Sequence, residues 1–216
     1  MRATIKCLCF STLAAVVLTA AAPAASAQEF GEAHQLTISA ERMFGFVHSS
    51  QSVEGQASRS QDEFSLLGNI GGAFTGYSWP RVAADIFVVP HVSLGGSVGV
   101  FHVSTDSGSL TGFLLAPRVG YAANLSSRVA IWPRAGFTYE HGSAEVGTGG
   151  LSVSSTANLF ALTLEAPLVI LLPPRVALTF GPAFDIGLTG SRSTGAVSVD
   201  TRVSDFGVHA GLLLYF

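Results

Sequence analysis

The chain ends in DFGVHAGLLLYF, residues 205–216, and this stretch decides the fold class. One set of alternate positions is apolar throughout and comprises Phe206, Val208, Ala210, Leu212, Leu214 and Phe216. The other set comprises Asp205, Gly207, His209, Gly211, Leu213 and Tyr215. Because side chains alternate between two faces with a period of two in a strand but not in a helix, the stretch predicts a β-strand with one apolar face.

The same alternation predicts eight strands, which cover residues 34–48, 79–88, 92–103, 110–123, 128–141, 155–170, 175–187 and 202–216. Each is long enough for a tilted membrane crossing, which takes about 9–11 residues. The opposite faces of several strands carry charges beside glycine and alanine, a pattern typical of a barrel with lipid outside and a polar lumen. We therefore predict an all-β fold, an eight-stranded antiparallel up-and-down transmembrane β-barrel over residues 34–216.

The predicted connections alternate in length. Those near residues 89–91, 124–127 and 171–174 are tight, whereas those over 49–78, 104–109, 142–154 and 188–201 are longer and rich in Ser, Gly and Thr. Short periplasmic turns and longer extracellular loops are typical of outer-membrane barrels. Within the first long loop, residues 64–67 are open to three interpretations: an extension of the second strand, a segment paired over the barrel mouth, or a short helix.

The first 27 residues predict a cleaved signal peptide. Arg2 and Lys6 precede an apolar segment over residues 7–22, and Ala25-Ser26-Ala27 forms a small-residue cleavage site. Residues 28–33 would then be a short periplasmic N-terminal segment ahead of the barrel. Both cysteines, Cys7 and Cys9, lie in the leader, so the mature chain is expected to have no disulfide and no thiolate metal site.

The C-terminus resembles the assembly signal of bacterial outer-membrane proteins, which His209, Gly211, Leu214 and Phe216 match. Strand number, size and the segments 80–87 and 94–99 resemble the eight-stranded outer membrane protein A-like barrel group. The resemblance implies the outer membrane of a Gram-negative bacterium. It also implies contact with outer-membrane lipid, with the barrel-assembly machinery and with periplasmic chaperones during biogenesis, and a monomeric state.

Alternation places a set of charged side chains in the predicted lumen, namely Glu41, Arg81, Asp85, Arg118, Arg134, Glu140, Glu165 and Asp185. A barrel of about eight strands has room only for packed side chains. Since an unpaired buried charge is costly, we expect a structural ion network that links Arg81, Arg118 and Arg134 to several of the carboxylates. Arg42 interrupts the outward face of its strand, which predicts a bulge or a change of register there.

No catalytic, metal or cofactor site is expected. Gly95-Gly96-Ser97-Val98-Gly99 matches the G-x-S-x-G motif, but it lies within a strand, whereas that motif requires a strand-to-helix turn. His209 lacks the serine two residues away that outer-membrane lipid A deacylases carry. His48, His102 and His141 lie near predicted strand ends, where solvated side chains are favoured over a metal site. Removal of Arg2 and Lys6 leaves nine basic residues against 14 acidic ones, which argues against a nucleic-acid partner.

The sequence therefore favours a non-enzymatic barrel with a filled polar lumen and a membrane-structural or loop-mediated interaction role. A narrow, porin-like pore for small solutes or ions is the alternative. A lipid-modifying outer-membrane enzyme is less favoured, because no complete catalytic set is present in the sequence.

Overall fold

The structure is a computed structural model that describes residues 29–66, 77, 79–105, 108–148, 151–195 and 197–216. The predicted leader lies outside these residues. In the part of the chain that is described, no helix is long and apolar enough to cross a membrane.

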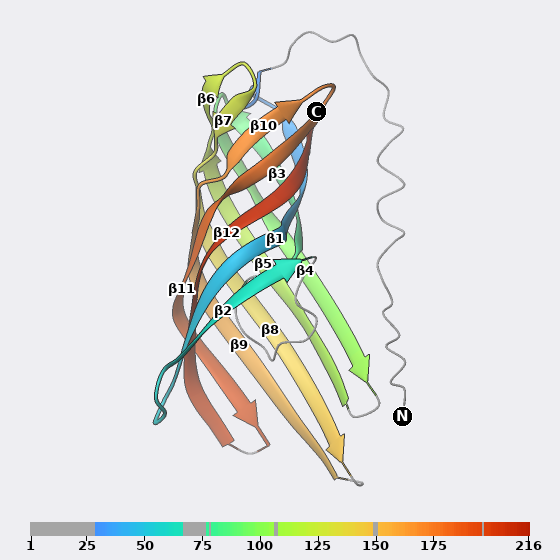
Figure 1. Ribbon diagram of the computed structural model, residues 1–216, viewed down its shortest axis with the longest axis vertical. Coiled ribbons are helices and arrows are strands. Elements are labelled where there is room, and N and C mark those ends of the chain that lie inside the picture. The colour runs from blue at the N-terminus through green and yellow to red at the C-terminus, as the bar shows by residue number, and fades with distance from the viewer. Residues whose placement is uncertain (1–28, 67–76, 78, 106–107, 149–150, 196) are drawn as a thin grey trace.

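Eight strands close an antiparallel barrel, which confirms the predicted fold class (Figure 1). They are β1 (Leu36–Val53), β3 (Arg81–Val89), β4 (Val92–Thr105), β5 (Gly108–Tyr121), β8 (Arg134–Thr148), β9 (Leu151–Glu165), β11 (Val176–Thr194) and β12 (Val197–Tyr215). Each pairs with its neighbour in this order, and β12 pairs with both β11 and β1 to complete the cylinder. We call the end where β1 begins and β12 finishes the base, and the opposite end the rim.

The apolar faces predicted from alternation point outward. On β3 the exposed side chains include Val82, Ile86 and Val88, while Arg81 and Asp85 at alternate positions are buried. On β12, Phe206 and Leu212 are exposed and Leu213 is fully buried. The barrel therefore has an apolar outer wall and a polar filling, as a membrane barrel requires.

Two predicted strands are each split by a proline. The predicted strand 128–141 is interrupted at Pro133, which separates β7 (Val129–Ile131) from β8, and the predicted strand 155–170 is interrupted at Pro167, which separates β9 from β10 (Leu168–Leu172). Proline has no N–H to donate to a strand ladder. Together with β6 (Ala123–Ser126), the short segments form a small extension at the base in the order β11-β10-β7-β6.

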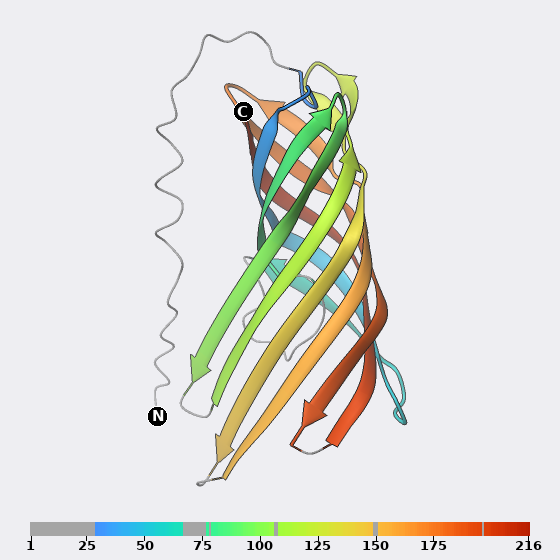
Figure 2. The ribbon, with the colours of Figure 1, turned by 180° about the vertical axis from the view of Figure 1, so that it is seen from behind.

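The rim differs from the prediction, because strands run through most of the expected loops. The bounds leave only residues 106–107, 149–150 and 195–196 between consecutive strands, in place of the loops 104–109, 142–154 and 188–201. Valine and threonine, which favour extended backbone, are frequent in these segments. The result is three long hairpins, which Figure 2 shows from behind.

The first predicted loop also contains a strand. β2 (Arg59–Leu66) folds back on β1 and pairs with it from Phe44 opposite Leu66 to Gln51 opposite Arg59. Phe64 therefore belongs to a strand rather than to a helix, and Leu67 lies outside the described residues. Below this pairing β1 exchanges partners, because residues 36–41 pair with β3.

Candidate functional site

The lumen is the candidate functional site, and an aromatic cluster fills its base. Phe30 is fully buried and lies edge-on to three rings, with centroid distances of 5.4 Å to Phe87, 5.5 Å to Trp132 and 6.3 Å to Tyr215. Edge-to-face contact is a preferred arrangement of aromatic rings. We call these four residues, with the small and aliphatic side chains packed among them, the base plug; the others are Ala122, Ala130, Val169, Ala177 and Leu213.

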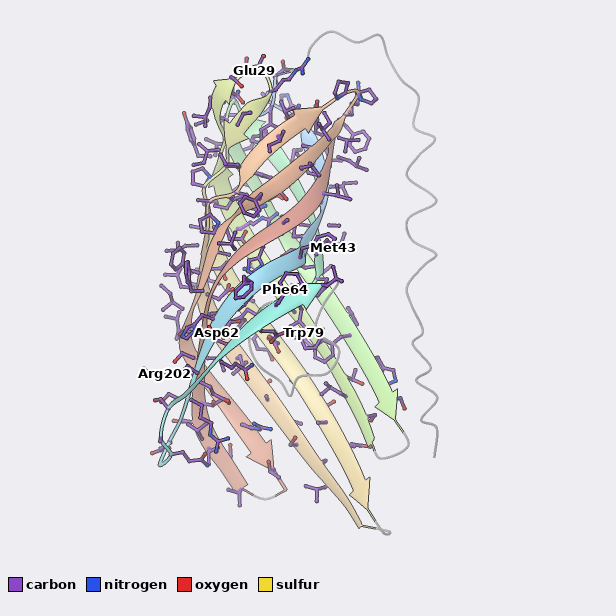
Figure 3. All side chains as sticks on the ribbon, viewed as in Figure 1. Glu29, Met43, Asp62, Phe64, Trp79 and Arg202 are labelled. Atoms are coloured by element: carbon purple, nitrogen blue, oxygen red, sulfur yellow. The ribbon has the colours of Figure 1, made fainter. Side chains whose placement is uncertain are left out.

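The N-terminal segment holds Phe30 in place through backbone contacts. Asn124 donates to the Phe30 carbonyl at 2.9 Å, the His91 N–H donates to the Gly31 carbonyl at 2.7 Å, and the Gly31 N–H donates to Gln35 Oε1 at 2.8 Å. Gly31 has φ of +94°, a conformation that favours glycine. Residues 29–33 therefore lie in the mouth of the barrel, and Figure 3 shows Glu29 at the base.

Above the base plug, Arg118 joins carboxylates from two strands. Its Nη1 lies 2.6 Å from Glu41 Oε2, and its Nη2 lies 2.6 Å from Asp85 Oδ2. A second bond, from Nε to Asp85 Oδ1 at 2.9 Å, makes the contact with Asp85 bidentate. Bidentate guanidinium–carboxylate pairs are among the stronger polar contacts in proteins.

Arg134 extends the pairs into a network. It lies 2.6 Å from Glu41 and 2.8 Å from Glu165, and Arg118 also lies 3.6 Å from Glu165. The Arg134 guanidinium carbon is 4.7 Å from the Trp132 ring centroid, within the range of a cation–π contact. The network therefore rests directly on the base plug.

Arg42 joins the network although alternation did not place it in the lumen. Its φ is +54°, and the β1–β12 register shifts between Ala40 and Phe44, which confirms the predicted irregularity. The shift turns Arg42 inward, where Nη1 lies 2.6 Å from Asp185 and Nη2 lies 2.9 Å from Glu165. Between Ala40 and Phe44 β1 advances four residues and β12 advances two, so β1 carries two extra residues, and an irregularity of this kind can redirect a side chain.

Arg81 and Glu140 differ from the expected network. Arg81 is buried, but among the described residues it forms no ion pair, and its Nη2 donates to the Tyr77 carbonyl at 2.6 Å. Arg42 donates to the same carbonyl at 2.8 Å. Glu140 is buried higher in the lumen, where the side chain of Trp79 bonds to it. The bulge explains the change, because Arg42 occupies the place beside Asp185 and Glu165.

Tyr77 caps the network on the rim side. It is fully buried and packs with Leu159, Ala161 and Val203, while its N–H donates to Asp205 Oδ2 at 2.6 Å. Nearby, Trp79 stacks on Phe101 with 3.9 Å between ring centroids. From base to rim the lumen thus contains the base plug, an ion network and a smaller apolar cluster.

The other predicted positions have ordinary surroundings. His48, His102 and His141 each bond to a separate partner, Asp62, Thr111 and Asn158 respectively. Within the described ranges, no three His, Cys, Asp or Glu side chains gather closely enough to hold a metal ion. Ser97 is buried within β4.

The predicted assembly-signal residues lie on β12 and at the chain end. Backbone bonds in both directions join Phe216 to Leu36, so the last residue pairs with the first residue of β1. His209 and Leu214 each pair with a residue of β1 on one side and of β11 on the other. Gly211 lies so close to the Ala40 carbonyl that a side chain at this position would collide with it. The structure places these residues at the barrel seam, and their reading by an assembly machinery stays a prediction.

Comparisons with known proteins bear on the fold. No protein-family model matches the chain, and no curated protein matches its sequence. Among solved structures, the outer membrane protein AlkL in DMPC bilayers has a TM-score of 0.56 at 14% identity, over 92% of this chain and 97% of AlkL. Neisserial surface protein A has a TM-score of 0.51 at 15% identity, and the match covers 84% of this chain and 97% of that protein. The outer membrane protein OprG from Pseudomonas aeruginosa has a TM-score of 0.51 at 10% identity, and the match covers 88% of this chain and 99% of OprG.

These likenesses, together with the closed barrel, define the class. The chain has the fold of the small eight-stranded outer-membrane β-barrels, as the alternation and the C-terminal pattern predicted. At this level of identity the likeness concerns the fold alone.

Proposed function

We propose that the protein resides in the outer membrane of a Gram-negative bacterium and acts there without catalysis, as a structural barrel or through its rim hairpins. Its outward apolar faces support contact with lipid. The predicted leader supports export, and the predicted assembly signal supports insertion by the barrel-assembly machinery with the help of periplasmic chaperones. The base would then face the periplasm, and the barrel would act as a monomer.

One observation carries the proposal: the lumen is filled at two successive levels. The base plug is apolar and fully buried at Phe30, Phe87 and Trp132, and the ion network lies directly above it. A cavity beside Glu41 and Arg134 has a volume of about 30 Å³. A water molecule needs about 10–15 Å³, so this cavity has room for a few waters at most. Such a filling supports a barrel that does not conduct.

The rim hairpins are the surface left for interaction. β11 and β12 have 19 residues each, and at about 3.3 Å per residue and a tilt of about 40° such a strand rises about 45 Å. The apolar band of an outer-membrane barrel is about 25 Å tall. About 20 Å of these strands would therefore stand beyond the lipid core, where serine and threonine are frequent.

Conductance of the refolded protein in a planar bilayer tests the proposal. We expect no discrete channel events from the wild type. The double variant Phe30→Ala, Arg118→Ala removes a side chain from each level and should increase the leak current across the bilayer. It serves as the control that the assay detects an opened lumen. Regular single-channel steps from the wild type would instead support the narrow pore.

Location needs a separate test. Deletion of Phe216 removes the pairing with Leu36 and should reduce the amount of heat-modifiable barrel in the outer-membrane fraction, whereas Phe64→Ala on exposed β2 should not. Recovery of a soluble folded monomer from the wild type would contradict the proposed location.

A further inference from the structure

The buried charges of the lumen do not balance. The described residues bury four arginines and six carboxylates in the barrel, namely Arg42, Arg81, Arg118 and Arg134 against Glu41, Asp85, Glu140, Glu165, Asp185 and Asp205. This leaves an excess of two negative charges. Burial of uncompensated charge is costly, so the two excess carboxyl groups are either protonated or matched by a further source of positive charge.

Three unpartnered oxygens locate the imbalance. They are Glu140 Oε2, Asp205 Oδ1 and the Tyr77 hydroxyl, for which the described part of the chain offers no hydrogen-bond partner, while Ser49 bonds to the Asp205 carboxyl group. The residues that carry them are 2%, 5% and 0% exposed. The carboxylates of the ion network, in contrast, each have a guanidinium within 3 Å.

The three oxygens belong to one neighbourhood. The Tyr77 ring packs on Leu159 and Val203, Glu140 is the cross-strand partner of Leu159, and Asp205 follows Val203 on the same inward face of β12. The Tyr77 N–H is bonded to the other oxygen of Asp205. Glu140 and Asp205 act on each other electrostatically, and both act on the Tyr77 hydroxyl.

The other groups around this neighbourhood do not supply the missing charge. Among the described residues, Arg81 is a nearby cation without an ion pair, and one positive charge cannot neutralise both Glu140 and Asp205. Asp185 is already paired with Arg42. Glu140 and Asp205 both act electrostatically on the Tyr77 hydroxyl, yet this hydroxyl donates a hydrogen bond to neither of them. Its lone pairs can therefore face a cation.

We propose that Glu140, Asp205 and Tyr77 form a binding site for a hard divalent cation, with Ca²⁺ as the probe. Carboxylate oxygens, completed by water, are ligands that Ca²⁺ prefers, the Tyr77 hydroxyl adds a neutral oxygen, and a charge of +2 balances the lumen. Only two carboxylates contribute, so the affinity belongs to the weak range, with a dissociation constant on the order of 10⁻⁴–10⁻³ M.

Terbium luminescence tests the site, because Trp79 bonds to Glu140 and can sensitise a Tb³⁺ ion bound there. The full chain without its leader is refolded with and without Ca²⁺, and Tb³⁺ emission is excited through tryptophan. We expect saturable emission that Ca²⁺ displaces. Glu140→Gln and Asp205→Asn should each raise the Ca²⁺ concentration that displaces half of the bound Tb³⁺ at least tenfold. Glu145→Gln, on an exposed position of the same strand, is the matched control and should leave it unchanged.

Stability provides a second measurement. Ca²⁺ at 10 mM should raise the Tm of the wild type and of Glu145→Gln, but not that of Glu140→Gln. If the carboxylate variants fail to fold, Tyr77→Phe removes one ligand with little change in shape and should weaken Ca²⁺ displacement several-fold. Absence of saturable emission from the wild type overturns the proposal. A Glu140→Gln variant that binds Tb³⁺ as the wild type does also overturns it. A third contradicting result is a Glu140→Gln variant that is more stable than a wild type whose Tm does not respond to Ca²⁺, because the Glu140 carboxyl group would then be protonated.

Discussion

The base plug and the ion network fill neighbouring levels of one lumen by different means. In the plug, Phe30 is enclosed by three rings and its side chain makes no polar contact. In the network, Arg118 contacts Glu41 and Asp85 at 2.6 Å, and each contact depends on the presence of both partners. Apolar packing tolerates loss in proportion to the volume removed, whereas removal of one ion leaves its partner buried and unpaired. The network should therefore be the more sensitive level.

Arg118→Met should produce the largest loss. It keeps much of the side-chain volume but leaves Asp85 without an ion pair, and we expect the free energy of unfolding to fall by about 4 kcal/mol. Urea unfolding of the refolded protein, followed by gel mobility, measures it. Combination with Asp85→Asn should restore part of the loss. A loss below about 1 kcal/mol would remove the contrast between the two levels.

Phe30→Ala should cost less, about 3 kcal/mol, at the low end for a buried phenylalanine, because the N-terminal segment can withdraw without unfolding the barrel. The same urea titration measures it. Phe64→Ala, on the exposed surface, is the control and should stay within about 0.5 kcal/mol of the wild type. Equal losses of unfolding free energy from Phe30→Ala and Phe64→Ala would show that Phe30 does not act as a plug.

Trp132 contacts both levels and tests whether they are coupled. A double-mutant cycle between Trp132→Leu and Arg134→Met should give a coupling free energy of about 1 kcal/mol from the cation–π contact. The matched cycle between Trp132→Leu and Asp62→Asn, whose residues share no contact, should give none. Strict additivity in the first cycle would mean that the levels are independent.

Asp62→Asn should have the smallest effect. Asp62 lies 2.7 Å from His48, but both side chains are more than half exposed, so this ion pair should contribute no more than about 0.5 kcal/mol. Urea unfolding of the single variant measures it. A loss comparable to that of Arg118→Met would show that charge pairing at the rim matters as much as in the lumen.

The sequence predicted the features that depend on alternation. The eight strands follow from a period of two, and the same period points Glu41, Asp85, Arg118, Arg134 and Glu165 toward one another. The inward turn of Arg42 was missed, because the irregularity places two consecutive residues, Glu41 and Arg42, on the inner face, whereas strict alternation allows only one of them there. Alternation detected the break at this point but could not say which side the arginine would take.

The base plug could not be predicted in the same way. Phe30 stands in a short segment without periodicity, and its surroundings come from β3, from the junction ahead of β8 and from β12, which meet only in the closed barrel. Pro133 and Pro167 were visible signals that the strands break at the base. Had they been treated as strand ends, Trp132 would have been placed at a junction rather than within a wall.

The pairing of Leu36 with Phe216 has a consequence for how the barrel forms. The two residues are separated by 180 positions, and the β1–β12 seam continues from them to the rim. Neighbouring hairpins such as β4–β5 can form from local contacts, but the seam requires the two ends of the sequence to meet, with the large loss of chain entropy that long-range contacts entail. Until that step, β1 and β12 present unsatisfied edges that invite association with other chains. We therefore expect closure to be the slow step, at which this barrel is most exposed to aggregation.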